Sequence, residues 1–103
     1  MKISETIQKS LDLICKKHRV NNLYLFGSMA KGTDKSESDI DLLVQFGPVD
    51  LYHYFDNYTE LKSELERLFE RTIDLIEDQA IRNPVFRHIV DRDKKQIYGR
   101  KVD

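Results

Sequence analysis

Hydrophobic residues recur along the chain with a helical spacing in two long stretches. Near the N-terminus they step by four, four and three positions, which predicts an amphipathic helix over about the first seventeen residues. Its apolar positions are Ile3, Ile7, Leu11 and Ile14. A second stripe predicts the longest helix, from Asp50 to about Glu70. Its apolar positions are Leu51, Phe55, Tyr58, Leu61, Leu65 and Leu68.

Shorter apolar runs predict four strands. In the clearest of them, residues 39–46, Ile40 and Leu42 share one face of the strand, whereas Asp39 and Asp41 share the other. Polar or turn-forming residues flank each run. The other three predicted strands are residues 22–26, 72–76 and 96–98.

A further helix is predicted to begin at Asn83 and Pro84. Asparagine is a common N-cap, and proline is favoured at the first helical position because its missing N–H costs nothing there. The apolar residues Val85, Ile89 and Val90 are expected to be buried by this helix. The predicted order αβαβαβα indicates an α/β or α+β fold, in which helices cover one small mixed β-sheet within a single domain, residues 1–103.

Composition limits the function classes that need to be considered. The chain has 103 residues, of which 40% are hydrophobic and 34% charged, with a formal net charge of −1. This charge gives no electrostatic footprint for direct nucleic-acid binding, and no apolar run is long enough for a membrane span. Cys15 is the single cysteine, which excludes an internal disulfide and fits a reducing cytoplasm; we expect it to be a half-buried hydrophobic residue.

The most informative stretch runs from Leu23 to Phe46, LYLFGSMAKGTDKSESDIDLLVQF. It contains a Gly-Ser pair, ten further residues and an Asp-x-Asp pair, with the glycine at the end of one strand and the aspartates at the start of the next. A Gly-Ser pair alone usually marks a turn, and an Asp-x-Asp pair alone usually marks a solvated strand edge. The joint pattern at this spacing is far more specific.

The carboxylates of this pattern predict a magnesium site. Asp39 and Asp41 lie two residues apart on one strand face, roughly 7 Å by strand rise. Asp74 lies inside the later apolar run and would join them if its strand pairs alongside. Such a cluster of negative charges is costly without a cation, and hard oxygen ligands without nearby His or Cys suit Mg²⁺.

The residues before the aspartates predict a phosphate site. Gly27 allows a ligand to approach the backbone, and the Ser28 hydroxyl and the backbone N–H groups that follow can donate hydrogen bonds to phosphate. Lys31 can neutralise further phosphate charge. Together with the carboxylates, these residues predict in-line displacement at phosphorus assisted by two metal ions.

Other candidate sites are weaker. His18, His53 and His88 lie in different predicted helices without metal-ligand spacing, so we interpret them as surface or core residues. Arg82, Asn83 and His88 have the R-N-x4-H spacing of the HEPN ribonuclease motif. We interpret this match as coincidence because it spans a helix start and the chain is not all-helical.

The stretch GSMAKGTDKSESDIDLLVQF resembles the characteristic motif of the DNA polymerase β-like nucleotidyltransferase superfamily. The later stretch RTIDLIEDQAIRNPVFRHIVDRDKKQIYG is similar to the closing half of minimal nucleotidyltransferase (MNT) antitoxins, which are encoded beside HEPN toxins. The resemblance covers nearly the whole chain from Asn22 onward. It implies a palm-like fold and transfer of AMP from ATP to a hydroxyl, that of a tyrosine, of a HEPN ribonuclease with which the chain forms a hetero-oligomer.

The resemblance also implies roles for individual residues. Asp39 and Asp41 would bind both Mg²⁺ ions, and Asp74 would bind the catalytic ion and help to deprotonate the acceptor. Gly27 and Ser28 would hold the β- and γ-phosphates. Many relatives read G-S-R-A-R-G where this chain has Met29 and Lys31. The lysine keeps a charge but lacks the bidentate geometry of arginine, which weakens the expected phosphate clamp and leaves the metal site unchanged.

Two alternative functions remain open from the sequence. The chain could neutralise a toxin by binding alone, with a vestigial nucleotide site. It could also modify a small molecule or an RNA end, although no basic patch and no second substrate domain are evident in the sequence.

Overall fold

The computed structural model describes residues 2–27 and 39–100. Its described helices and strands follow the predicted order, and their limits differ from the predicted ones by a few residues. The short helix that this order places between the first two strands, over residues 28–31, lies outside the described residues. The described elements are α1 (Glu5–Lys17), β1 (Val20–Phe26), β2 (Ile40–Phe46), α3 (Leu51–Phe69), β3 (Ile73–Glu77), the 3₁₀-helix η1 (Asp78–Ala80), α4 (Pro84–Asp93) and β4 (Lys95–Gly99). No helix in these residues is long and apolar enough to cross a membrane.

The strands form one mixed sheet in the order β3-β2-β1-β4. Strand β1 pairs antiparallel with both β2 and β4, whereas β2 and β3 are parallel. A parallel pair needs a crossover connection, and α3 provides it. The prediction of a small mixed sheet covered by helices is therefore confirmed.

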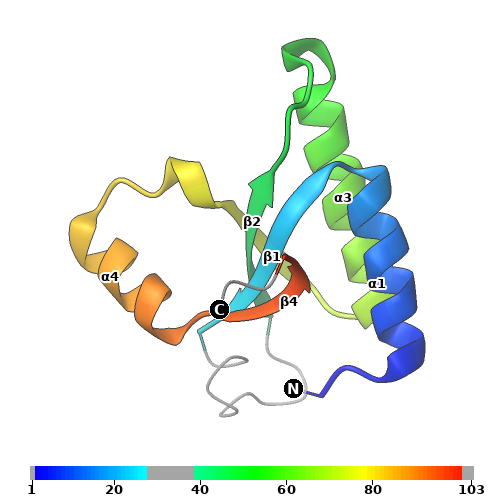
Figure 1. Ribbon diagram of the computed structural model, residues 1–103, viewed down its shortest axis with the longest axis horizontal. Helices are drawn as coiled ribbons and strands as arrows, with labels where there is room; N and C mark the ends of the chain where they lie inside the picture. Colours follow the sequence, from blue (N-terminus) through cyan, green and yellow to red (C-terminus); the bar gives the residue numbers. More distant parts are fainter. Residues whose placement is uncertain (1, 28–38, 101–103) are drawn as a thin grey trace.

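Helices cover both faces of this sheet (Figure 1). Helices α1 and α3 pack on one face over the main core, to which Leu11, Leu42 and Leu65 contribute fully buried side chains. Helix α4 lies on the other face, where a smaller core of Phe26, Leu43 and Val90 forms. Because apolar side chains on both faces of β2 are buried, this central strand reads as a nearly continuous apolar run.

Three burial predictions were wrong in detail. Cys15 is completely buried rather than half-buried, and burial raises the pKa of its thiol to about 12. In α4 the side chain of Val90 is buried, but those of Val85 and Ile89 are exposed. A helical stripe predicts which residues share a face. The packing of the helix against the sheet decides which part of that face is covered.

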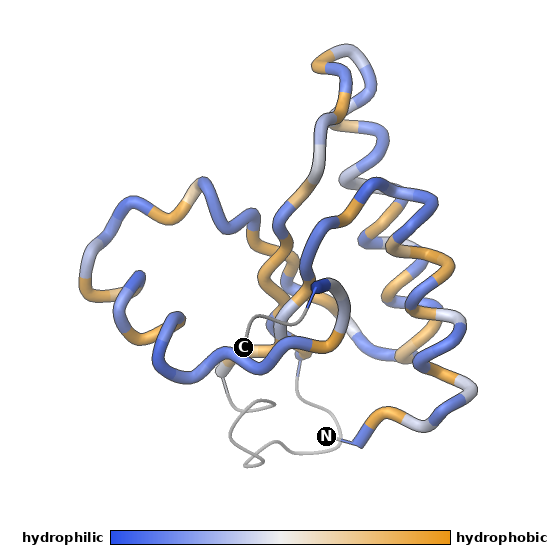
Figure 2. Tube along the Cα trace, viewed as in Figure 1, coloured by the Kyte–Doolittle hydropathy of each residue, from blue (hydrophilic) through white to orange (hydrophobic). Residues whose placement is uncertain are grey.

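The N-terminal end of α3 also departs from its prediction, because Leu51 and Phe55 are exposed. This end of the helix extends beyond the sheet (Figures 1 and 2). The 19 residues of α3 span about 28 Å, whereas the seven residues of β2 span about 23 Å. The helix is therefore about one turn longer than the strand, and its fully buried residues, Leu61 and Leu65, lie in its later part.

A buried histidine fastens the end of α1 to α3. The side chain of His18 is almost fully buried, with Nδ1 3.0 Å from Asn57 Oδ1 and Nε2 in contact with Glu64 Oε2. Asn57 also donates through Nδ2 to the His18 carbonyl oxygen at 2.8 Å, which fixes the orientation of its amide. Lys17 forms a second ion pair with Glu64 at 3.0 Å. These contacts make His18 a core residue, in agreement with its interpretation from the sequence as a surface or core residue.

We expect Glu64→Gln to lower the free energy of unfolding by about 1–3 kcal/mol at neutral pH, because it leaves a buried imidazole without its charged partner. The hydrogen bond from His18, followed by that from Lys17, lowers the pKa of the Glu64 carboxyl below its ordinary 4.5. The resulting stabilisation is complete above pH 4.5 and is lost as the pH falls through the lower folded-state pKa. Urea unfolding between pH 3 and 7 measures both effects, with the exposed Glu60→Gln as a control. Equal curves for the two variants would contradict the expectation.

Candidate active site

Two of the predicted carboxylates lie side by side in the sheet. The parallel pairing of β2 and β3 makes Asp41 and Asp74 register partners, so their Cα atoms are about 5 Å apart. Partners in adjacent strands point to the same face of a sheet. For this pair it is the face that α4 covers, since Leu43, two residues after Asp41, packs beneath that helix. Asp39 is exposed and directly precedes β2.

Gly27 lies against the Asp41 carboxylate at the end of β1. Its φ angle of +69° is one that L side chains rarely adopt. A Cβ atom added at this position would come within 2.7 Å of Asp41 Oδ2. Phe26, the preceding residue, is the register partner of Asp41 across β1 and β2. The position therefore requires glycine for both conformation and space.

Negative charge is concentrated around Asp41. Partial burial raises the pKa of its carboxyl above the ordinary 3.8, and the charges of Asp74 and Asp39 raise it further. In the described ranges, which leave out residues 28–38, no three His, Cys, Asp or Glu side chains are placed to hold a metal ion together. The carboxylates thus form a crowded negative region next to Gly27. Their hard oxygen donors suit Mg²⁺, which also retains positions for water and phosphate oxygens.

Ser28 and Lys31, the other predicted nucleotide-binding residues, lie outside the described residues, as does Met29. Their roles remain predictions. The structure brings together Gly27, Asp41 and Asp74, and the charge of Asp39 acts on the same carboxyl.

Side-chain contacts that the sequence patterns did not predict join α4 to η1 and to β1. Arg87 pairs with Asp78 of η1 at 2.6 Å and with Asp91 at 2.8 Å. The rings of Phe86 and Phe26 contact edge to face at a centroid distance of 6.1 Å, and the phenylalanine of β1 directly precedes Gly27. The four-residue spacing of Arg87 and Asp91 was a readable signal for a helical ion pair. The pairing with Asp78 depends on the tertiary fold.

Arg82, Asn83 and His88 have the spacing of the HEPN motif, and the structure explains why an asparagine stands at the central position. Asn83 is the N-cap of α4, and its side-chain oxygen accepts hydrogen bonds from the backbone N–H groups of Val85 and Phe86. The side chains of Arg82 and His88 are exposed. The amide thus caps a helix, which agrees with the interpretation of this motif as coincidence.

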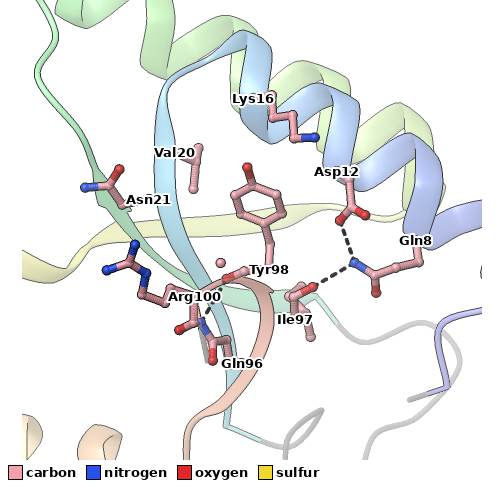
Figure 3. Close-up of a pocket in the computed structure, with 10 residues that line it drawn as sticks. Gln8, Asp12, Lys16, Val20, Asn21, Gln96, Ile97, Tyr98 and Arg100 are labelled. Carbon is pink, nitrogen blue, oxygen red and sulfur yellow. Dashed lines mark hydrogen bonds between the residues drawn. The ribbon is translucent and has the colours of Figure 1, made fainter. Parts of the chain in front are cut away.

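A large open hollow lies elsewhere, between α1 and β4 (Figure 3). It has a volume of about 720 Å³, and Lys16, Tyr98 and Arg100 contribute to its lining. Gln8 donates hydrogen bonds to Asp12 and to the backbone carbonyl of Ile97 across its floor. Strand β4 lies at one edge of the sheet, and β3, which carries Asp74, lies at the opposite edge. The hollow is therefore separate from the carboxylates.

Comparison with known sequences gives a consistent set of similarities. The family model described as "Polymerase beta, Nucleotidyltransferase" matches residues 5–103. A protein of Methanocaldococcus jannaschii named as a candidate protein adenylyltransferase is 35% identical over 91 residues, which cover 88% of this chain and 90% of that protein. A second protein of that organism with the same designation is 31% identical over the same coverage.

Solved structures share the fold. One described as a minimal nucleotidyltransferase superposes with a TM-score of 0.72 and 27% identity, covering 87% of this chain and 88% of that chain. A tri-AMPylated HEPN toxin in complex with an MNT antitoxin from Shewanella oneidensis gives a TM-score of 0.62 and 20% identity, with 93% and 72% coverage. A toxin–antitoxin crystal structure with AMP-PNP gives 0.69 and 24%, with 91% and 74% coverage. At these identities the two complexes are evidence for the fold alone.

Proposed function

Because the chain belongs to the polymerase β nucleotidyltransferase family, whose model spans residues 5–103, we propose that it transfers AMP from ATP to a partner protein. The partner is a HEPN-class ribonuclease toxin, the acceptor is a hydroxyl group such as that of tyrosine, and the modification neutralises the toxin. The observation that carries the proposal is the pairing of Asp41 with Asp74 beside the Gly27 backbone.

Asp39, Asp41 and Asp74 would hold two Mg²⁺ ions in this reaction. Their carboxylates supply the hard oxygen ligands that Mg²⁺ prefers. Among the described residues no three of these side chains already surround one ion position, so phosphate oxygens and water would complete the coordination. Partial burial raises the pKa of Asp41, and the charges of Asp74 and Asp39 raise it further; a cation would neutralise that charge. When bound, Mg²⁺ supplies charge stabilisation at the transferring phosphoryl group. The exposed position of Asp74 at the edge strand β3 leaves its side chain accessible to an incoming acceptor.

The remaining steps follow from the chemistry of the residues. The acceptor oxygen attacks the α-phosphorus while the bond from that phosphorus to the oxygen bridging the α- and β-phosphates breaks, so that pyrophosphate leaves. Asp74 takes the proton of the acceptor hydroxyl. Gly27 has no side chain, so its backbone allows the phosphates to approach Asp41 closely. Ser28 and Lys31 would add a hydroxyl donor and a positive charge to the phosphate site.

A protein acceptor is supported by the relatives rather than by the carboxylates themselves. Two relatives above 30% identity are named as candidate protein adenylyltransferases, and one structure of the same fold contains an AMPylated HEPN toxin. The net charge of −1 gives no comparable support for an RNA substrate.

We expect AMP to be added to the HEPN-class protein encoded beside this chain when the two are incubated with Mg²⁺ and ATP. Intact-protein mass spectrometry detects the adduct, and a ribonuclease assay measures loss of toxin activity. Omitting Mg²⁺ in a parallel reaction tests the metal requirement. Replacing ATP with α,β-methylene-ATP, in which the bond that must break is blocked, distinguishes catalysis from binding. A toxin that is silenced without gaining AMP would contradict the proposal and would favour neutralisation by binding alone.

A further inference from the structure

Helix α4 carries apolar side chains on two sides. Val90 faces the sheet and is buried, but Val85 is 67% exposed and Ile89 is 41% exposed. The two exposed residues are four positions apart and therefore adjacent on the helix surface. Figure 2 shows apolar positions within the α4 segment as well as in the strands. We call Val85 and Ile89 the outer row of α4.

The exposure of this row does not result from a loosely held helix. Asn83 caps the N-terminus of α4, and Arg87 ties the helix to η1 through the side chain and the backbone carbonyl of Asp78. At the other end, Lys94 lies over the ring of Tyr24 at 4.7 Å. Helix α4 is thus tied to η1 through Arg87 and to β1 through Lys94, and these contacts orient its outer row as a preformed binding surface requires.

The outer row belongs to the layer that covers the carboxylate face. Val90 and Phe86 of α4 contact the smaller core that includes Leu43 and Phe26. Asp41 lies on this face next to Leu43, and Gly27 follows Phe26. A protein that reaches Asp74 from this side of the sheet passes beside α4.

Charge around the row limits the chemistry of its partner. The acidic residues of the helix are already paired, Asp91 with Arg87 and Lys94, and Asp93 with Arg92. Arg82, directly before the N-cap of α4 and three positions before Val85, has an exposed side chain. An apolar row beside this guanidinium complements an apolar surface that carries carboxylates.

We propose that the outer row of α4 is the docking surface for the protein that accepts AMP, and that it binds an amphipathic helix with acidic residues beside its apolar face. This inference rests on the proposed function for the identity of the partner. Apolar anchors surrounded by polar side chains commonly supply most of the affinity of a protein interface. Docking here would place the acceptor on the side of the sheet that carries Asp41 and Asp74.

The chain contains a matched control for this surface. Leu51 and Phe55 are also four positions apart on a helix and are 89% and 73% exposed. They lie in the first turns of α3, just after the end of β2, whereas Asp41 lies at the start of that strand. The control pair is therefore at the other end of the sheet from the carboxylates.

The test compares two double variants, Val85→Gln with Ile89→Gln and Leu51→Gln with Phe55→Gln. Glutamine is compatible with helices, and circular dichroism verifies that both variants fold. Calorimetric titration into the HEPN-class protein, without ATP, measures binding separately from transfer. We expect the α4 variant to bind about tenfold to a hundredfold more weakly and the α3 variant to bind like the unchanged chain. Arg82→Glu should also weaken binding, and more so at low salt.

The outcomes separate this inference from the proposed function. Weaker binding by the α4 variant, with no AMP transfer by the unchanged chain, would support the docking surface and contradict the proposed reaction. Normal binding by the α4 variant would overturn the docking surface whatever the transfer assay shows. Light scattering provides a further test. If the unchanged chain forms a dimer that the α4 substitutions dissociate, the docking surface would also be overturned, because the row would then bind a second copy.

Discussion

Asp41→Asn is expected to abolish AMP transfer and at the same time to make the fold more stable. The substitution removes one charged oxygen ligand from between Asp39 and Asp74. We expect the rate of transfer to fall by about a thousandfold or more, which corresponds to roughly 4 kcal/mol of lost transition-state stabilisation. Mass spectrometry of the partner under single-turnover conditions measures this loss.

The gain in stability follows from the raised pKa of Asp41, which burial and the charges of Asp74 and Asp39 cause. A carboxyl whose folded-state pKa lies above its unfolded value of 3.8 destabilises the fold as the pH rises through the interval between the two values. That penalty is complete at neutral pH, and asparagine does not carry it. Without Mg²⁺, the variant should therefore unfold at a higher temperature than the unchanged chain at pH 7, and the advantage should disappear below pH 3.8.

Asp56→Asn is the matched control, because Asp56 is an exposed carboxylate on α3, away from the sheet face that carries Asp41. It should change neither the transfer rate nor the pH dependence of unfolding. An Asp41→Asn variant that retains transfer, or that loses it by unfolding, would contradict the assigned role.

The sequence predicted the part of this site that depends on strand periodicity. Alternation along residues 39–46 correctly separates Asp41 from the face of Ile40 and Leu42, which packs in the main core. It could not show whether β3 runs parallel to β2. The alignment of Asp41 with Asp74 depends on that direction and on a register that are set by long-range packing.

The sequence was less informative about which parts of a helix are covered. Val85 and Val90 satisfy the same apolar pattern, yet one is exposed and the other buried. The difference depends on where α4 crosses the sheet, which the ion pair between Arg87 and Asp78 helps to determine. Local periodicity contains no information about a contact of this kind. The same limit applies to Leu51, at the end of α3 that extends beyond the strands.

Gly27→Ala should also slow transfer strongly, though less than the loss of Asp41 does, even though it removes no functional group. The φ angle of +69° costs an alanine about 1–2 kcal/mol. Its Cβ would also come within 2.7 Å of Asp41 Oδ2 and force the carboxylate or the backbone to move. A displacement of about 1 Å at a reacting centre can cost roughly a hundredfold in rate, so we expect transfer to fall by about that factor.

Gly47→Ala separates this effect from a general cost of losing glycine. The added Cβ would meet Asn21 Oδ1 at 2.9 Å, only slightly farther than the 2.7 Å contact at Gly27, at the other end of β2. Gly47 is not among the described glycines that have a positive φ, and the atom it meets belongs to a side chain that can rotate. The control should leave the transfer rate unchanged.

A double-mutant cycle tests the contact between Gly27 and Asp41 directly. In an Asp41→Ala background the crowded oxygen is absent, so Gly27→Ala should cost less unfolding free energy than it does in the unchanged chain. The cost that remains measures the φ strain alone, and the difference measures the contact. Urea unfolding of the four proteins provides these values. Equal costs in both backgrounds would show that the glycine is required only for its conformation, and the close approach of its backbone to Asp41 would then have no energetic consequence.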